Sequence, residues 1–184
     1  EKVKAGSVLM IDKNRPEIKF VSPVSGEVTA VNRGEKRKVL SIVVKPDAQI
    51  EYEEFGKKNV ASLQGAEVKE VLLNAGMWPF IKQRPYDIVA APLDTPRDIF
   101  VSAFYSAPLA PNFDFIVKGQ EADFQTGLNA LAKLTNGKVY VGVRSGSVVS
   151  GMKGVEIVEV EGPHPAANVG VQINHIKPVN KGEV

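Results

Sequence analysis

The sequence has 184 residues, enough for one large domain or two small ones, and its 43% hydrophobic and 24% charged residues are typical of a globular protein. Its 23 basic and 21 acidic side chains give a net charge of +2, which is too balanced to indicate a nucleic-acid-binding protein. The sequence contains no cysteine, which excludes disulfides, thiolate metal sites and cysteine nucleophiles within it. No apolar run approaches the ~20 residues of a membrane-spanning helix, so we expect no transmembrane segment.

Two short patterns in the first third of the chain predict a β module. Val3–Gly6 and Val31–Gly34 share the spacing Val-x-x-Gly, and each is followed by an apolar run rich in β-branched residues. Glycine readily adopts the positive φ of a tight turn, and β-branched residues favour strands. The two units together predict a small pseudo-symmetric β barrel or sandwich. Two unrelated hairpins are the alternative.

The segment SPVSGEV, Ser22–Val28, is typical of the hairpins in biotinyl and lipoyl carrier domains. A carrier displays its prosthetic group on a lysine at the tip of a tight hairpin, and Lys13 lies nearest to that place. Pro16 follows closely, and it has no N–H to donate to a strand ladder. We therefore expect a barrel without a carrier arm, with Lys13 as an exposed loop residue. A lipoyl- or biotin-type carrier is the alternative.

The middle of the chain predicts a βαβ unit. In residues 66–75 and 121–134, apolar side chains recur at helical spacing, and a glycine follows each segment closely. Residues 99–104, 138–143 and 154–160 are apolar and rich in β-branched residues, which predicts strands. Strand, helix and strand in this order predict a parallel sheet with a right-handed crossover.

Parallel sheets bind ligands beyond the carboxyl ends of their strands, so the segments after 99–104 and 138–143 are candidate sites. Neither segment contains the glycine pattern of a dinucleotide site, and the sequence has no phosphate-binding GK[ST] loop. His164 and His175 are the only histidines, and a metal site would need more ligands in a clustered spacing.

Four segments resemble the A-subunit family of the sodium-translocating NADH:quinone oxidoreductases, which are bacterial respiratory complexes. They follow the family's order along the chain and are Ser22–Val44, Arg84–Phe115, Gly127–Val143 and Gly162–Ile176. The most specific features are the tripeptide TPR and the pentapeptides APLAP and GPHPA, because a generic βαβ unit requires none of them.

The resemblance implies an α/β fold, α+β overall. A biotinyl/lipoyl-like β barrel-sandwich module precedes a Rossmann-like parallel βαβ domain that resembles the flavin-binding domain of complex I. We assign residues 1–57 to the β module, which we expect to be incomplete at its N-terminus, and 58–161 to the α/β domain. Residues 162–184 are expected to form a loop and a return strand that leads to a missing C-terminal part. Because the sequence opens without Met, we interpret it as a fragment lacking both ends.

The resemblance also implies a function. The implied function is that of a non-redox peripheral subunit on the cytoplasmic face of the bacterial inner membrane. The complex that contains this subunit oxidises NADH, reduces ubiquinone or menaquinone and pumps sodium ions. NADH, the flavins and an iron–sulfur centre are expected to be held by other subunits, and no cofactor or catalytic centre is expected in this chain. The expected partners are those subunits, above all the membrane-embedded quinone-site subunit, with no nucleic acid. The alternative is a vestigial flavin- or nucleotide-binding domain of an electron-transport complex.

The resemblance implies roles in complex assembly and in quinone binding. A quinone site needs an apolar, aromatic cleft with a few polar groups near the carbonyl oxygens. The candidate quinone-contact residues are Arg84, Phe104, Tyr105, Pro108, Leu109 and Phe113. Arg84 or Tyr105 would donate a hydrogen bond to a quinone carbonyl. Alternatively, these residues pack the domain or face a neighbouring subunit.

Overall fold

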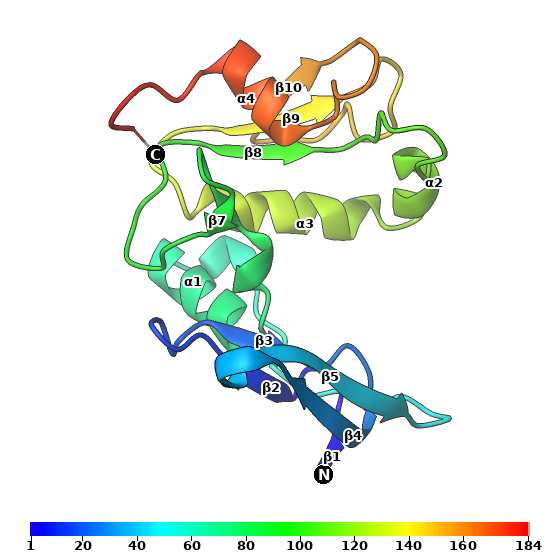
Figure 1. Ribbon diagram of the computed structural model, residues 1–184. Coiled ribbons are helices and arrows are strands. Elements are labelled where there is room, and N and C mark those ends of the chain that lie inside the picture. The colour runs from blue at the N-terminus through cyan, green and yellow to red at the C-terminus, as the bar shows by residue number, and fades with distance from the viewer. Residues whose placement is uncertain (184) are drawn as a thin grey trace. The chain divides into compact units, whose positions relative to one another are not determined.

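The computed structural model describes residues 1–183, which divide into two compact units. Unit 1 comprises Glu1–Lys58 and Lys69–Ile81, and unit 2 comprises Asn59–Val68 and the residues from Lys82 onward. The chain passes from one unit to the other within helix α1 (Gly65–Asn74), which confirms the helix predicted over 66–75 (Figure 1). None of the described helices is long and apolar enough to cross a membrane.

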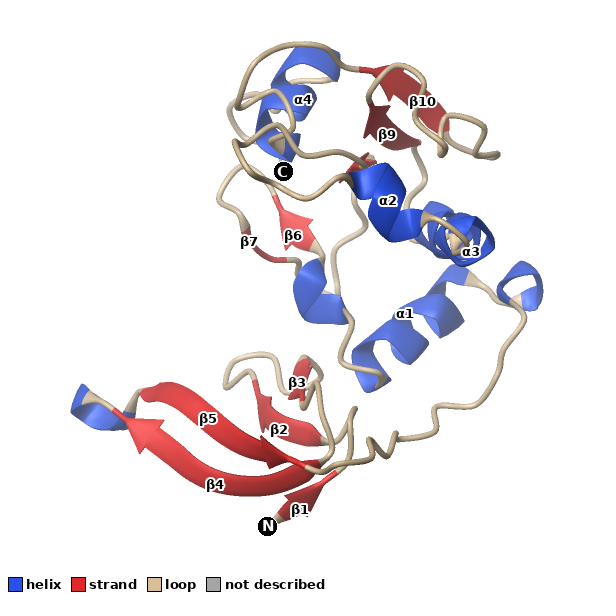
Figure 2. Cartoon of the chain, turned by 90° about the vertical axis from the view of Figure 1, so that its right-hand side faces the viewer, coloured by secondary structure: helices blue, strands red, loops and turns tan. Residues whose placement is uncertain are grey.

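Unit 1 is built mainly of antiparallel β structure (Figure 2). Its strands are β1 (Lys2–Val3), β2 (Val8–Ile11), β3 (Lys19–Val21), β4 (Gly26–Arg33) and β5 (Val39–Pro46), and its short helices are η1 (Glu35–Arg37) and η3 (Trp78–Phe80). One sheet has the order β1-β4-β5, and β2 pairs with β3 in a second. The predicted β module is therefore confirmed.

The carrier-like segment SPVSG serves to pack unit 1. Ser22 and Ser25 are each only 1% exposed. The Ser22 hydroxyl donates to the Val24 carbonyl at 2.7 Å, and the Ser25 hydroxyl accepts from the Glu51 N–H at 2.9 Å. At Gly26 a Cβ atom would lie 2.0 Å from the Lys45 carbonyl oxygen of β5, so only glycine lets the two strands approach this closely.

The loop that holds Lys13 differs from a carrier hairpin. Residues 12–18 connect β2 to β3, and the Asp12 carboxylate accepts from the N–H groups of Asn14 at 2.8 Å and Arg15 at 2.9 Å. Ile18 closes the loop with an exposure of 1%. Lys13 is exposed, as the sequence predicts, and it lies on a folded seven-residue loop rather than at the tip of a tight turn.

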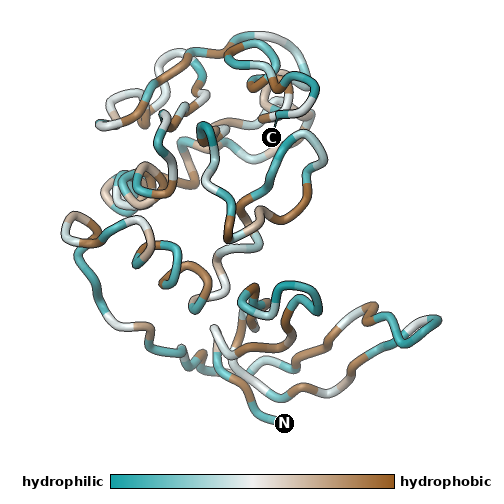
Figure 3. The backbone as a smooth tube through the Cα atoms, turned by 90° about the vertical axis from the view of Figure 1, so that its left-hand side faces the viewer, coloured by the Kyte–Doolittle hydropathy of each residue, from teal (hydrophilic) through white to brown (hydrophobic). Residues whose placement is uncertain are grey.

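The β4–β5 hairpin extends well beyond its partner strand. Strand β1 pairs only with Gly26 and Glu27, at the base of β4, whereas β4 and β5 continue to pair as far as Arg33 and Val39. The backbone is hydrophobic along parts of both strands and hydrophilic at the turn (Figure 3). The distal part of the hairpin therefore has two outer edges that no other strand of residues 1–183 covers.

Unit 2 contains the predicted parallel sheet. Its elements are η2 (Val60–Ser62), β6 (Lys82–Gln83), β7 (Ile88–Val89), β8 (Ile99–Ser102), α2 (Phe113–Val117), α3 (Glu121–Ala132), β9 (Val139–Val143), β10 (Glu156–Glu159) and α4 (Val169–Ile176). The strand order is β10-β9-β8, with every pair parallel, so the α/β fold is confirmed.

The central strand β9 is covered on both faces. Val141 and Val143, both 0% exposed, belong to a core cluster that includes Leu128 of α3. On the opposite face Tyr140 stacks on Phe100 with their ring centroids 4.8 Å apart. Helices α3 and α4 lie on opposite sides of the sheet (Figure 1). This is the layering expected when a strand alternates its side chains between two buried faces.

One predicted element is wrong. We expected a loop and a return strand over residues 162–184, but α4 occupies Val169–Ile176. Its valine and isoleucine residues favour a strand by propensity. The Asn168 side chain caps the helix by accepting a hydrogen bond from the Gly170 N–H at 2.9 Å, and α4 buries Gln172 and Ile173. Capping and packing together outweigh the strand propensity. Val184 lies outside the described residues.

Replacing Gly26 with alanine is predicted to destabilise unit 1 by about 3 kcal/mol, because the new Cβ would meet a backbone carbonyl that cannot rotate away. Urea denaturation followed by circular dichroism measures the change. Gly127→Ala is the control, since a Cβ at this position in α3 would contact nothing within 4 Å. It should instead stabilise the chain by about 0.5–1 kcal/mol. Equal effects of the two substitutions would contradict the close approach at Gly26.

Candidate functional site

The carboxyl ends of β8, β9 and β10 meet at one edge of the parallel sheet, which we call the carboxyl edge. The segments 103–112, 144–155 and 160–168 leave the sheet there. Backbone hydrogen bonds extend the ladder at this edge, from the Ala103 N–H to the Gly142 carbonyl and from the Val160 N–H to the Val143 carbonyl, both at 2.8 Å. In open parallel sheets this is the edge at which ligands bind.

A row of aromatic rings runs from the core to the surface at the carboxyl edge. Phe124 of α3 packs edge-on against Phe113, with their ring centroids 5.6 Å apart, and Phe113 lies 6.5 Å from Tyr105. The Asn112 side chain fixes the start of α2 by accepting from the Phe115 N–H at 3.2 Å. Tyr105 is 49% exposed, so its ring and phenol are available to a ligand.

The other candidate quinone-contact residues in this segment differ in burial. Phe104 is buried, whereas Pro108 and Leu109 are exposed. Leu109 has φ 60°, in the left-handed region that leucine rarely adopts. Its side chain is fully exposed and makes up part of the surface of the carboxyl edge.

Arg144 lies next to these aromatic residues, although the sequence did not single it out as a site residue. Its guanidinium lies 5.5 Å from the centre of the Phe104 ring, and its Nη2 donates to the Tyr105 carbonyl at 3.4 Å. A cation over an aromatic face is held in place electrostatically. Its position in the sequence could have identified it as a site residue. Arg144 directly follows β9, so it must lie at the same edge of the sheet as the aromatic segment.

Hydrogen bonds join the three segments of the carboxyl edge. Ser106 Oγ lies 3.3 Å from His164 Nδ1 and accepts from the Ala167 N–H at 3.0 Å. The Ser147 hydroxyl donates to the Asp114 carboxylate at 2.6 Å. Ser106 thus connects the segment after β8 to the segment before α4 through both His164 and Ala167.

The polar pair Gln172 and Ser102 holds the segment before α4 at the carboxyl edge. Gln172 of α4 is 3% exposed, and its Nε2 donates to Ser102 Oγ at 3.0 Å and to the Ala166 carbonyl at 3.2 Å. The Ser102 hydroxyl in turn donates to the Ala167 carbonyl at 2.7 Å. Gly142 makes room for the amide, since a Cβ there would lie 2.2 Å from Gln172 Oε1. The segment before α4 is thereby fixed to β8.

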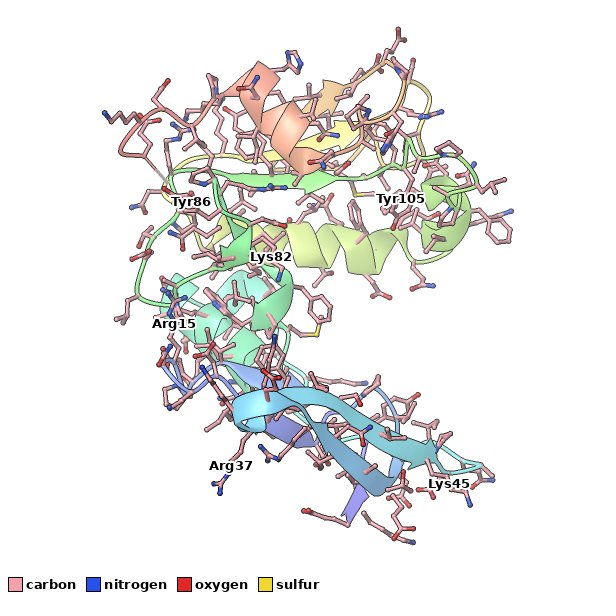
Figure 4. All side chains as sticks on the ribbon, in the orientation of Figure 1. Arg15, Arg37, Lys45, Lys82, Tyr86 and Tyr105 are labelled. Carbon is pink, nitrogen blue, oxygen red and sulfur yellow. The ribbon has the colours of Figure 1, made fainter. Side chains whose placement is uncertain are left out.

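Arg84 is placed in a different environment from the aromatic segment. Its Nε lies 3.7 Å from the Asp87 carboxylate, and its guanidinium packs against Gly170 in the first turn of α4. Tyr86, two residues further on, lies well apart from Tyr105 (Figure 4). The fold thus brings Phe104, Tyr105 and Phe113 together with Arg144 rather than with Arg84.

The start of α3 does not fit the phosphate of a flavin or a nucleotide. The Glu121 carboxylate accepts from the Gly119 N–H at 3.0 Å. Hydrogen bonds from the backbone N–H groups of Glu121 itself and of Gly119 lower the pKa of this carboxyl below its usual value. A negative charge therefore already occupies the helix N-terminus, where a phosphate would otherwise bind.

No group of three or more histidine and acidic side chains among residues 1–183 could hold a metal ion. The strongest ionic cluster is at the amino edge of the sheet, around Asp98, whose side chain is 1% exposed. Asp98 accepts from the Lys138 N–H at 3.0 Å and pairs with Lys177 at 2.5 Å and Arg97 at 3.3 Å. Burial raises the pKa of Asp98, but these hydrogen bonds and the two positive charges outweigh it and leave the pKa below its usual value.

These observations define a two-unit class of protein, in which a barrel-sandwich β unit precedes an α/β unit with a parallel three-stranded sheet. Comparison of the sequence with known protein families agrees with this two-unit class. Residues 1–47 match the NqrA N-terminal barrel-sandwich hybrid domain, and residues 63–184 match the NqrA second alpha/beta domain. The chain therefore belongs to the NqrA family.

Individual relatives carry the corresponding name. The chain is 38% identical over 184 residues to the A subunit of the Na(+)-translocating NADH-quinone reductase of Photorhabdus laumondii, and 36% identical over 185 residues to that of Yersinia pestis. In both comparisons the match covers 98% of this chain and 41% of the relative. The chain thus spans about two fifths of the length of these relatives.

The lowered pKa of Asp98 predicts a stability that depends on pH. The pKa of Asp98 is lower in the folded chain than in the unfolded chain, where it is about 3.9. The ionised carboxylate therefore stabilises the fold at any pH above that unfolded pKa. This contribution is lost as the pH falls through the folded-state pKa. Asp98→Asn should therefore lower the free energy of unfolding by about 2 kcal/mol at pH 7, and the difference should shrink below pH 4. Urea denaturation across pH measures it.

Glu156→Gln is the control for Asp98→Asn. Glu156 pairs with Lys138 at 2.7 Å, but both side chains are at least half exposed. Solvent screens such a pair, so the loss at pH 7 should stay below about 0.5 kcal/mol. A pH-independent loss in Asp98→Asn would contradict the assigned role of Asp98.

Proposed function

We propose that this chain is part of the A subunit of a sodium-translocating NADH:quinone reductase, in which it acts as a non-redox peripheral component. The observation that carries the proposal is the identity of 36–38% over 98% of the chain to proteins named as that subunit. Its roles in this proposal are assembly with the other subunits and contact with quinone at the carboxyl edge. NADH oxidation and electron transfer are assigned to other subunits.

The residues of unit 2 support a non-redox role. The Glu121 carboxylate at the start of α3 repels a flavin or nucleotide phosphate. The sequence supplies no cysteine for an iron–sulfur cluster. A parallel α/β sheet can position a phosphate, but the side chains at the edge of this sheet favour a ligand without one.

The carboxyl edge suits a quinone better than a phosphate. A quinone head group is a flat, largely apolar ring with two carbonyl acceptors, and it calls for aromatic contact plus a few hydrogen-bond donors. The ring of Tyr105 supplies the aromatic surface, and its phenol supplies a donor. Arg144 uses Nη2 on the Tyr105 carbonyl, and a guanidinium has five N–H donors in all, so others are available to a quinone carbonyl.

The surface around this edge also supports docking to another subunit. Leu109 is fully exposed, and Phe115 and Ile116 of α2 are 81% and 49% exposed. Large apolar side chains grouped on one surface are typical of protein interfaces. We assign this surface to the membrane-embedded quinone-site subunit on the cytoplasmic face of the inner membrane. That arrangement would let a quinone reach Tyr105 from the bilayer.

The proposal predicts that the chain binds a short-chain ubiquinone and that two side chains control the affinity. Tyr105→Phe removes the phenol donor and Arg144→Gln removes the guanidinium, and each should raise Kd about tenfold, equivalent to the loss of one hydrogen bond. Isothermal titration calorimetry measures Kd for each variant.

Tyr86→Phe is the matched control, because it removes the same phenol from a tyrosine that is 79% exposed and lies away from the carboxyl edge. Its Kd should equal that of the unmodified chain. Unchanged affinity in both Tyr105→Phe and Arg144→Gln would remove quinone contact from the proposal. Saturable binding of flavin mononucleotide would instead favour a vestigial flavin domain.

A further inference from the structure

We propose that the turn between β4 and β5 binds the anionic headgroups of a phospholipid bilayer. This basic turn comprises Arg33–Lys38, with the sequence RGEKRK. It forms the free end of the hairpin, beyond the part of β4 that pairs with β1 (Figure 2). The proposal rests on the proposed function in one respect only, since sodium translocation requires a bilayer close to the complex.

Positive charge is concentrated in the basic turn. It contains four of the chain's 23 basic side chains and one of its 21 acidic side chains. Four cations less one carboxylate give these six residues a net charge of +3, larger than the +2 of the whole chain. The rest of the chain is therefore close to neutral, and the basic turn dominates the attraction of the chain to an anionic surface.

The cations of the turn are available to an external partner. Arg33, Lys36, Arg37 and Lys38 are all exposed, and none takes part in an ion pair with another residue of the described part of the chain. One guanidinium N–H of Arg33 donates to the Arg37 carbonyl at 3.1 Å, which braces the turn. The Arg37 side chain extends away from the ribbon (Figure 4).

The backbone of the turn is unusual for its sequence. The Lys38 N–H donates to the Glu35 carbonyl at 3.1 Å, and the two residues between them have φ values of 52° at Lys36 and 62° at Arg37. Positive φ at both central residues is the geometry of a type I′ turn, which strongly favours Asn-Gly. Lysine and arginine are costly there, and a local rule broken at an exposed tip is expected where the side chains have a function.

Exposed apolar residues adjoin the cations. Leu40 is 63% exposed, Val31 47% and Val39 36%, and the Leu40 side chain lies against Gly34 of the turn. Nucleic acid or a purely acidic protein surface would match the charges but leave these aliphatic groups in water. The interface of an anionic bilayer accepts both, because cations pair with headgroups while neighbouring apolar side chains enter the acyl boundary.

The test measures partitioning of the purified 184-residue chain onto vesicles by sedimentation. We expect binding to vesicles of phosphatidylcholine mixed with phosphatidylglycerol, little binding to phosphatidylcholine alone, and weaker binding as salt is added. The variant Lys36→Asn with Arg37→Gly removes two cations and restores the residues that the turn favours. Its partition coefficient should fall about 30-fold, at roughly one kcal/mol per cation.

This variant also separates binding from folding. Because Asn-Gly suits the turn, its Tm should equal or exceed that of the unmodified chain. The control is Lys57→Asn with Lys58→Gly, which removes the same charge from two exposed lysines of unit 1 outside the hairpin. The control should bind within about twofold of the unmodified chain, since its lysines lie outside the basic turn.

Three results would overturn the proposal. They are no binding to anionic vesicles, equal binding to neutral vesicles, and equal losses in the hairpin variant and its control. The assay contains neither quinone nor a partner protein. The vesicle result therefore does not depend on whether the chain binds quinone. If vesicle binding is lost, the quinone titration still tests the quinone site separately.

Discussion

Burial of strand β9 on both faces is the constraint on which the α/β unit depends. Val141 and Val143 lose all exposure against the α3 side, while Tyr140 and Gly142 face the α4 side. A strand buried on both faces needs a helix over each, and the crossover through α3 supplies one of them while making β8 and β9 parallel. Parallel pairing then sends the ends of all three strands to the same edge. The carboxyl edge is therefore a consequence of core packing, and its chemistry depends on which residues follow each strand.

The chemistry at this edge differs from that of a nucleotide-binding sheet in one specific way. Such a sheet leaves a helix N-terminus free for a phosphate, whereas here Glu121 occupies that position with its own carboxylate. The cation Arg144 lies beside the aromatic rings, over Phe104 and against the Tyr105 carbonyl. The Asp114 carboxylate nearby accepts from the Ser147 hydroxyl. Under the proposed function, this arrangement would accept an uncharged, flat ring with carbonyl acceptors, such as a quinone.

Periodicity made the buried elements predictable, since the helices over 65–74 and 121–132 and the strands of the parallel sheet carry apolar side chains at the expected spacing. Periodicity did not predict helix α4, because its β-branched residues favour a strand, whereas the cap at Asn168 and the burial of Gln172 and Ile173 favour a helix. The grouping of side chains at the carboxyl edge could be predicted in part, whereas their contact with a quinone stays a proposal. Phe104, Tyr105 and Phe113 follow directly from strand-end position, but Arg144 meets them only through the pairing of β8 with β9. The aromatic neighbour Tyr86 in the sequence suggests Arg84 as a contact, but the fold places Arg84 against α4.

Hydrogen–deuterium exchange with and without a saturating short-chain quinone tests the central claim most directly, because it locates a bound ligand along the whole chain. The account predicts slower exchange in residues 103–117 and 144–149, at and beside the carboxyl edge, with no change in the loop around Arg84 and Tyr86. Slowing confined to residues 82–89, or no slowing anywhere at saturation, would contradict the placement of a quinone contact at this edge.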